Sequence, residues 1–161
     1  MKIFSAIFIS ILFCGCVYTF TGASIQPHLK TIAIPLFDDR SGFGEPNVKE
    51  KLTSGVLDLF IRDNTLSISD RMSADAVLEG AVISINDAPA IIEKGERIGT
   101  RRLTIIVHIV FNDLQLRKKI WEKDFSQYGD YETSGQNRTI AIDEAIKKIS
   151  EDILLQTVSG W

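Results

Sequence analysis

The sequence has very little cysteine or histidine, and this shortage removes several classes of function. Its two cysteines, Cys14 and Cys16, stand close together near the start, so the rest of the chain can form no disulfide. Its two histidines, His28 and His108, belong to no nucleophile motif and form no cluster with metal-ligand spacing. We therefore expect no catalytic residue, no metal site and no cofactor, and the protein is not expected to be an enzyme.

Signatures for binding nucleotides and nucleic acids are missing as well. Gly42 and Gly44 come without the lysine and the following serine or threonine of a phosphate loop. The acidic pair Asp38-Asp39 suits a turn, in which aspartate side chains bond nearby backbone amides. The formal net charge is −3, which argues against a general nucleic-acid binder.

The start of the chain is typical of an exported lipoprotein. A lysine precedes an apolar run from Ile3 to Phe13, which is too short to span a bilayer as a stable helix. Gly15 precedes Cys16, and a small residue before a cysteine is the pattern at which bacterial lipoproteins are cut and acylated. Bulky Phe13 makes Cys14 a poorer candidate. We expect a signal peptide at 1–15 and a palmitate-type lipid anchor on Cys16; the alternative is a buried N-terminal element with two core cysteines.

The pattern of apolar residues after Cys16 predicts a lipidated tether over 16–29 and a single domain over 30–161. Alternating or β-branched runs predict strands at 30–37, 66–69, 77–85, 101–111 and 120–128, of which the second and third could be one interrupted strand. Pro35 gives the first strand an edge position or a bulge. Helical spacing predicts helices at 46–62 and 139–157, with a polar loop at 129–138 before the second. The fold class is α+β: a small sheet of about four strands with two helices packed on one face.

Positive charge gathers in the predicted hairpin at 101–128. Eight basic and four acidic side chains lie between Glu93 and Lys123. The two ends of the hairpin carry the candidate anion-binding residues Arg101, Arg102, Arg117, Lys118 and Lys119. One interpretation is that they only prevent the sheet edge from pairing with neighbours. The other is two separate sites for phosphorylated sugars of a lipid head group, since arginine and lysine both bind phosphate.

Several short motifs, in order, resemble one known family. They are Cys16-Val17-Tyr18-Thr19-Phe20-Thr21-Gly22-Ala23-Ser24-Ile25, Lys30-Thr31-Ile32-Ala33-Ile34-Pro35-Leu36-Phe37, Arg40-Ser41-Gly42, Asp70-Arg71, Ala74-Asp75, Leu78-Glu79-Gly80 and Tyr128. Together they are similar to the LptE-type lipopolysaccharide-assembly lipoproteins, especially the branch found in Bacteroidetes and Chlorobi-like bacteria. The resemblance implies a small sheet with two helices. Only Cys16 is carried over from the family residue by residue.

The resemblance also implies a place in the cell and a set of partners. The protein would be lipid-anchored in the inner leaflet of the outer membrane and would face the periplasm. It would act as a plug within a large β-barrel of LptD type and would contact lipopolysaccharide during its transport to the cell surface. A second resemblance rests on the apolar strand that leads through Pro35 and Phe37 to Ser41-Gly42. It points to secretion-associated and TolB-like periplasmic lipoproteins related to the curli exporter, which have a structural or binding role.

Overall fold

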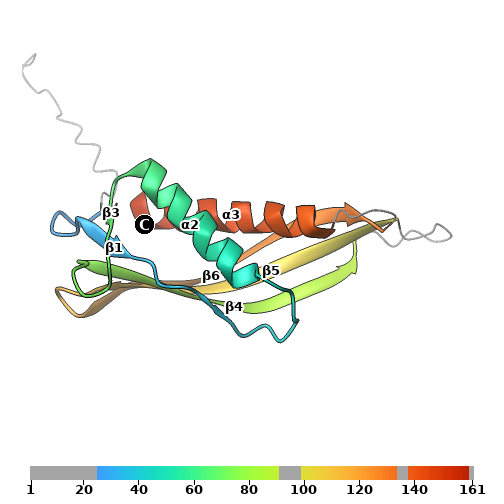
Figure 1. The fold of residues 1–161 in the computed structure, drawn as a ribbon, viewed down its shortest axis with the longest axis horizontal. Coiled ribbons are helices and arrows are strands. Elements are labelled where there is room, and N and C mark those ends of the chain that lie inside the picture. Colours follow the sequence, from blue (N-terminus) through green and yellow to red (C-terminus); the bar gives the residue numbers. More distant parts are fainter. Residues whose placement is uncertain (1–24, 91–98, 134–137, 160–161) are drawn as a thin grey trace, which may run out of the picture.

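A computed structural model describes residues 25–90, 99–133 and 138–159. Its strands and helices, in chain order, are β1 (Thr31–Ala33), β2 (Asp38–Asp39), α2 (Val48–Asp63), β3 (Ser67–Ile68), β4 (Ala76–Pro89), β5 (Thr100–Asp113), β6 (Lys118–Glu132) and α3 (Arg138–Val158). They form one six-stranded sheet with the order β3-β1-β4-β5-β6, and β2 pairs with β4. Both helices lie on the same face of this sheet (Figure 1).

The long strands β4, β5 and β6 form an antiparallel meander, while β1, β2 and β3 add short parallel pairs at one side. The α+β class and the two helices on one face are therefore confirmed. The sheet has more strands than the expected four because the expected strand at 30–37 is divided into β1 and β2, and because β3 and β4 do not form one interrupted strand. The segments at 66–69 and 77–85 belong to two separate strands.

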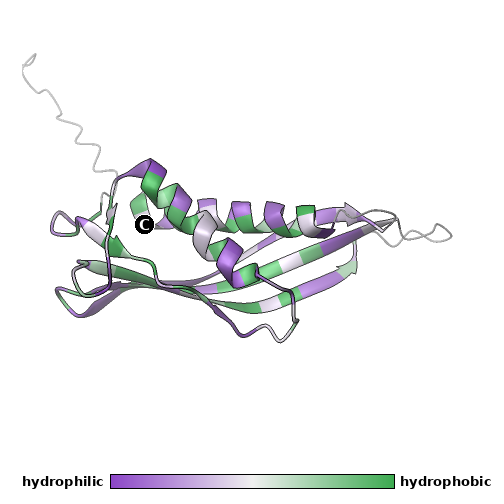
Figure 2. Ribbon diagram, in the orientation of Figure 1, coloured by the Kyte–Doolittle hydropathy of each residue, from purple (hydrophilic) through white to green (hydrophobic). Residues whose placement is uncertain are grey.

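Strand β5 shows why the helices cover one face only. Its odd-numbered apolar residues from Leu103 to Phe111 are buried, while the residues between them are partly exposed. Because successive side chains on a strand point to opposite faces, this alternation creates one apolar face. The helices pack against it with a stripe from α2, which includes Leu52 and Val56, and a stripe from α3, which includes Ile149 and Ile153. Hydrophobic and hydrophilic residues alternate along both helices in Figure 2.

The expected continuous strand at 30–37 is wrong, because the chain leaves the sheet between β1 and β2. Four residues lie between Ala33 and Asp38, while three lie between their partners Val77 and Ala81 on β4, so one extra residue bulges out around Pro35. Proline has no backbone N–H to give to a neighbouring strand. The N–H of Phe37 bonds instead to the Thr53 hydroxyl of α2 at 3.0 Å. The bulge is confirmed, and the edge position for β1 is wrong because β3 lies beside it.

Two other strands extend further than expected. β4 continues through Asp87 to Pro89, and β6 continues through Gly129 to Glu132, into the expected polar loop. Gly129 is a place of close packing: a Cβ atom there would come within 2.2 Å of the Ala141 carbonyl oxygen. The glycine therefore lets α3 lie close to β6, and it does not mark a turn.

Candidate functional site

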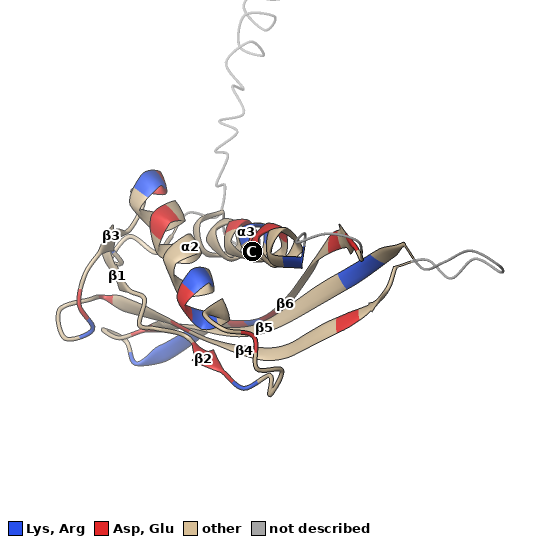
Figure 3. Cartoon of the chain, turned by 45° about the vertical axis from the view of Figure 1, so that its right-hand side comes forward, with Lys and Arg blue, Asp and Glu red and all other residues tan. Residues whose placement is uncertain are grey.

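The candidate site residues fall into three groups, and the structure describes two of them. Cys16 lies outside the described residues, so its lipidation stays a prediction. The other two groups lie at opposite ends of β5: Arg101 and Arg102 at its start, and Arg117, Lys118 and Lys119 at the turn into β6. Figure 3 shows basic residues at both ends of this hairpin.

The residues just before β1 lie at the same end of the domain as the β5–β6 turn. Asp75 connects these residues to the turn. One carboxylate oxygen of Asp75 accepts bonds from the backbone N–H groups of Lys30 and Thr31 at 2.8 and 2.9 Å and from the Thr31 hydroxyl at 3.0 Å. Its other oxygen accepts a bond from the Gln115 side chain in the turn. These bonds, above all that from the Lys30 amide, lower the pKa of Asp75 to about 2. Asp75 is therefore ionised at neutral pH.

Asp113 makes a second link between the same two segments. Its carboxylate lies 2.6 Å from the ring nitrogen Nε2 of His28 and accepts a 2.8 Å bond from the Leu116 amide. Burial raises the pKa of Asp113, but the bonds from Leu116 and His28 outweigh burial and keep that pKa below its usual value. His28 and Leu29, at the end of the expected tether, pack on the domain: His28 contacts the hairpin through Asp113, and Leu29 is buried.

The turn itself presents an exposed cationic tip. Arg117 adopts a left-handed backbone conformation with φ 51°, and Lys118 and Lys119 follow it into β6. Lys119 forms an ion pair with Glu122. Among the residues that the structure describes, Arg117 and Lys118 have no acidic partner within ion-pair distance. We call Leu116 to Lys119 the basic tip; Leu116 is exposed beside the cations.

The basic residues at the other end of β5 are matched by carboxylates. The Nε of Arg101 lies 2.8 Å from the Asp87 carboxylate. Arg102 makes two bonds to Asp130, at 2.7 and 2.8 Å, and stacks over the Tyr128 ring at 3.7 Å. Two bonds to one carboxylate fix the guanidinium in a specific geometry. Arg101 and Arg102 can therefore bind an external anion only in competition with these carboxylates.

Asp87 is the centre of a half-buried polar cluster beside Arg101. The Tyr131 hydroxyl donates to it at 2.6 Å, and Arg138, the first residue of α3, reaches it at 3.3 Å. Burial raises the pKa of Asp87, yet the bonds from Tyr131 and Arg101 prevail and the pKa lies below its usual range. Arg138 also pairs with Glu45 at 2.6 Å. This cluster joins β4, β5, β6 and α3, which is a structural role.

The second histidine, His108, lies on the face of the sheet that the helices leave open. Its two ring nitrogens are 3.0 Å from Glu122 and 2.6 Å from Asp124 on the neighbouring strand. The described residues contain no group of three or more histidine, cysteine, aspartate or glutamate residues placed to hold a metal ion. Among the same residues, no helix is long and apolar enough to cross a membrane.

Comparison with known proteins identifies a family over most of the domain. The family model LptE, described as lipopolysaccharide-assembly, matches residues 29–157. This match confirms the resemblance indicated by the motifs. No curated protein sequence matches the chain.

Solved structures share the fold at low sequence identity. CT253 from Chlamydia trachomatis aligns with a TM-score of 0.61 at 7% identity, over 80% of this chain and 95% of that one. A PelC dodecamer subunit from Paraburkholderia phytofirmans gives 0.53 at 12%, over 86% and 95%. Rare lipoprotein B from Shewanella oneidensis gives 0.50 at 15%, over 78% and 91%. At such identities the likeness concerns the fold alone.

Proposed function

The chain belongs to the LptE family of lipopolysaccharide-assembly proteins, and we propose that it acts as an outer-membrane lipoprotein that plugs a β-barrel partner of LptD type. The observation that carries this proposal is the family match over 29–157. The proposed role is binding and positioning, with no chemical step. The lipid on Cys16 would hold the domain on the periplasmic side of the membrane.

The fold supports a definite orientation relative to that anchor. Asp75 and Asp113 fix the first described residues of the chain beside the β5–β6 turn. The chain between Cys16 and His28 can reach at most about 40 Å when fully extended. Because the tether would end beside this turn, the basic tip of an anchored domain would lie, on average, nearer to the membrane surface than the Arg101 end of the hairpin.

The basic tip is also the better candidate for contact with lipopolysaccharide. Its Arg117 and Lys118 have no acidic partner among the described residues, whereas Arg101 and Arg102 are already held by Asp87 and Asp130. Phosphate groups suit both cations of the tip, since arginine binds phosphate through two parallel bonds and lysine acts as a point charge.

The test is purification of the lipoprotein from outer membranes, with identification of the co-purifying barrel by mass. Three forms are compared: the parent, the double variant Arg117→Glu/Lys118→Glu, and the control Lys49→Glu/Lys147→Glu, which changes net charge equally on the two helices. We expect all three to retain the barrel and only the tip variant to lose bound lipopolysaccharide, measured in low salt where such contacts are least screened. Absence of any barrel from the parent would contradict the plug role. Normal lipopolysaccharide binding by the tip variant would contradict the tip contact.

A further inference from the structure

Strand β6 is the last strand of the sheet, and much of its outer edge is open. Thr133, just past the end of β6, donates its N–H to Gly99 at 3.0 Å, so odd-numbered residues of β6 direct their backbone groups toward β5. Because this direction alternates along a strand, the even-numbered residues from Glu122 to Glu132 direct their N–H and C=O groups outward. A bond from the Lys148 side chain to the Tyr128 carbonyl, at 3.2 Å, agrees with that assignment. No strand pairs with this edge among the described residues.

The two halves of this edge differ in how well they are protected against pairing. Lys118, Lys119 and Lys123 lie in the first half, which also contains the irregularity opposite Phe111. Lysines and bulges are the usual means by which an edge strand avoids other chains. From Asp124 to Glu132 the strand contains no lysine, arginine or proline. We call this second half the open edge.

A groove lies between β6 and α3 beside the first residues of the open edge. It has a volume of about 430 Å³ and is lined by Lys123 to Ser126 on the strand and by residues that include Leu155 and Gln156 on the helix. Phe125 is buried at its side, while Leu155 is 61% exposed. An extended segment that paired with the open edge would place every second side chain on the helix side of the sheet, and the one beside Asp124 to Ser126 would reach this groove, where an apolar side chain would cover Leu155.

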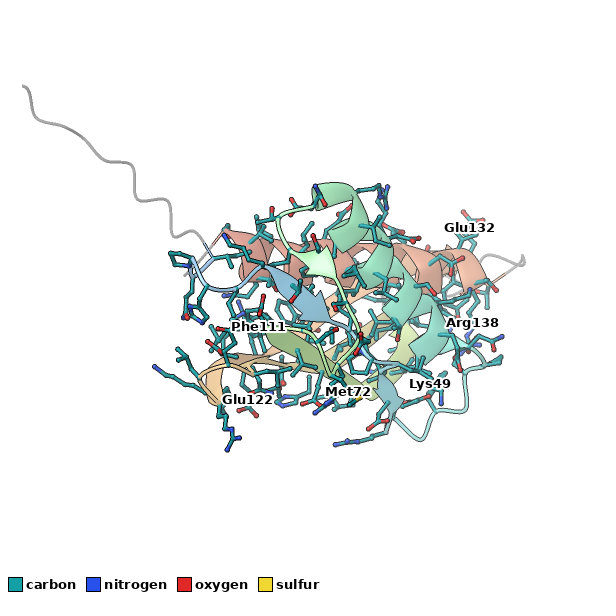
Figure 4. The ribbon with its side chains drawn as sticks, turned by 60° about the vertical axis from the view of Figure 1, so that its left-hand side comes forward. Lys49, Met72, Phe111, Glu122, Glu132 and Arg138 are labelled. Atoms are coloured by element: carbon teal, nitrogen blue, oxygen red, sulfur yellow. The ribbon has the colours of Figure 1, made fainter. Side chains whose placement is uncertain are left out.

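The opposite face of the same edge is acidic. Glu122, Asp124, Asp130 and Glu132 occupy four of the six outward-directed positions, and their side chains lie on the face away from the helices. Figure 4 shows Glu122 and Glu132 at opposite ends of this row. Three of these carboxylates already have partners, since Asp130 pairs with Arg102, Glu122 with Lys119, and both Glu122 and Asp124 lie beside His108. Among the described residues, Glu132 has no ion-pair partner, and the row as a whole holds more negative than positive charge. An added strand would gain from basic side chains on this face.

We propose that the open edge of β6 binds an extended segment of a partner protein as an additional strand, and that basic and apolar side chains alternate along that segment. Backbone bonds to the outward groups of residues 124–132 would provide affinity, while the acidic row and the Leu155 groove would select the side chains. This surface is distinct from the basic tip. The proposal does not depend on the role in lipopolysaccharide assembly.

The probe is a fluorescent synthetic peptide of alternating lysine and valine, about eight residues long, added to the full-length chain in detergent. We expect saturable binding and slower hydrogen exchange at the amides of Asp124, Ser126, Tyr128, Asp130 and Glu132. One control peptide has the same composition but carries its lysines and valines in two separate blocks; we call it the block peptide. This peptide and a peptide of alternating glutamate and valine should bind at least about tenfold more weakly. Methylation of alternate peptide nitrogens should weaken binding similarly, and this control needs no change in the protein.

The matched protein variants are Ser126→Pro and Ser126→Ala. Proline removes one outward N–H and leaves the bonds to β5 in place, so it should weaken binding while alanine should not. Equal binding of the block peptide, or of the N-methylated peptide, would overturn the proposal, because charge alone would explain the affinity. Full protection of the five amides before peptide is added would also overturn it, since the chain itself would then cover the edge. If the protein associated with itself and Ser126→Pro abolished that association, the edge would bind a second copy of this chain. The proposal of a different partner protein would then be overturned.

Discussion

Individual carboxylates hold the residues around the start of β1 against the rest of the domain. Asp75 binds Lys30 and Thr31 from one side and Gln115 from the other, so a single side chain connects segments that are far apart in the sequence. A residue with so many bonds to its ionised form contributes stability only while it remains ionised. The free energy of unfolding should therefore depend on pH through this one residue.

The substitution Asp75→Asn should reveal this dependence. The pKa of Asp75 is about 2 in the folded protein and lies below its value in the unfolded chain, so its contribution is present above the unfolded value and is lost as pH falls toward 2. Allowing for solvent screening, we expect Asp75→Asn to lower the free energy of unfolding at pH 7 by about 1 kcal/mol, with the difference shrinking below pH 4. Urea titrations at both pH values measure it. The control Asp58→Asn removes the same charge at an exposed position of α2, and a difference for Asp75→Asn that stayed constant with pH would contradict the assignment.

Asp113 could have been located from the sequence, whereas its partner could not. The buried face of β5 follows the odd numbers from Leu103, and this phase places Asp113 on the same face. A buried carboxylate needs a partner, so an extension of the expected strand from 111 to 113 would have indicated a polar contact there. Nothing local identifies His28 as that partner, because the two residues are 85 positions apart.

At the scale of elements, helix α3 depends on the match between its apolar stripe and the sheet. Ile149 is fully buried in this interface, and Leu155 on the same helix is 61% exposed. We expect Ile149→Ala to cost about 2–5 kcal/mol of unfolding free energy, because it removes buried methylene groups and leaves a cavity. Leu155→Ala, which removes a similar volume at the surface, should cost less than about 0.5 kcal/mol. Thermal or urea unfolding gives both values, and equal losses would refute this packing.

Periodicity in the sequence was enough to locate β5 and both helices, but it did not locate the interruption after β1 or the length of β6. In β5 the period-two alternation of apolar residues is local and therefore visible. At Phe37 the decisive bond comes from Thr53 on α2, and at Gly129 the decisive neighbour is Ala141 on α3. Both causes are contacts between distant residues. A sequence pattern cannot show them, and it made Gly129 resemble a loop residue.

At the scale of the whole molecule, the two ends of the hairpin differ in electrostatic character although their sequences look alike. Arg101 and Arg102 are neutralised by Asp87 and Asp130, while Arg117 and Lys118 project from the tip. The sequence predicted two separate basic ends and could not tell which one was already occupied, because the matching carboxylates lie on other strands. Arg117 and Lys118, which have no acidic partner among the described residues, lie at the end where Lys30 and His28 are held by Asp75 and Asp113.

If Cys16 carries a lipid anchor, the end of the hairpin with Arg117 and Lys118 would be the end nearer to the membrane. Gly15 fits a protease pocket that accepts only small residues, and burial of the acyl chains at about 0.8 kcal/mol per methylene makes attachment by more than one chain effectively permanent. We therefore expect Cys16→Ser to leave an unprocessed precursor or a soluble protein without palmitate label, while Cys14→Ser is processed and labelled like the parent. Metabolic labelling and intact mass distinguish the forms. If Cys16→Ser still gave a palmitate-labelled protein of mature mass, the anchor would be elsewhere, and proximity of the basic tip to the membrane would lose its support.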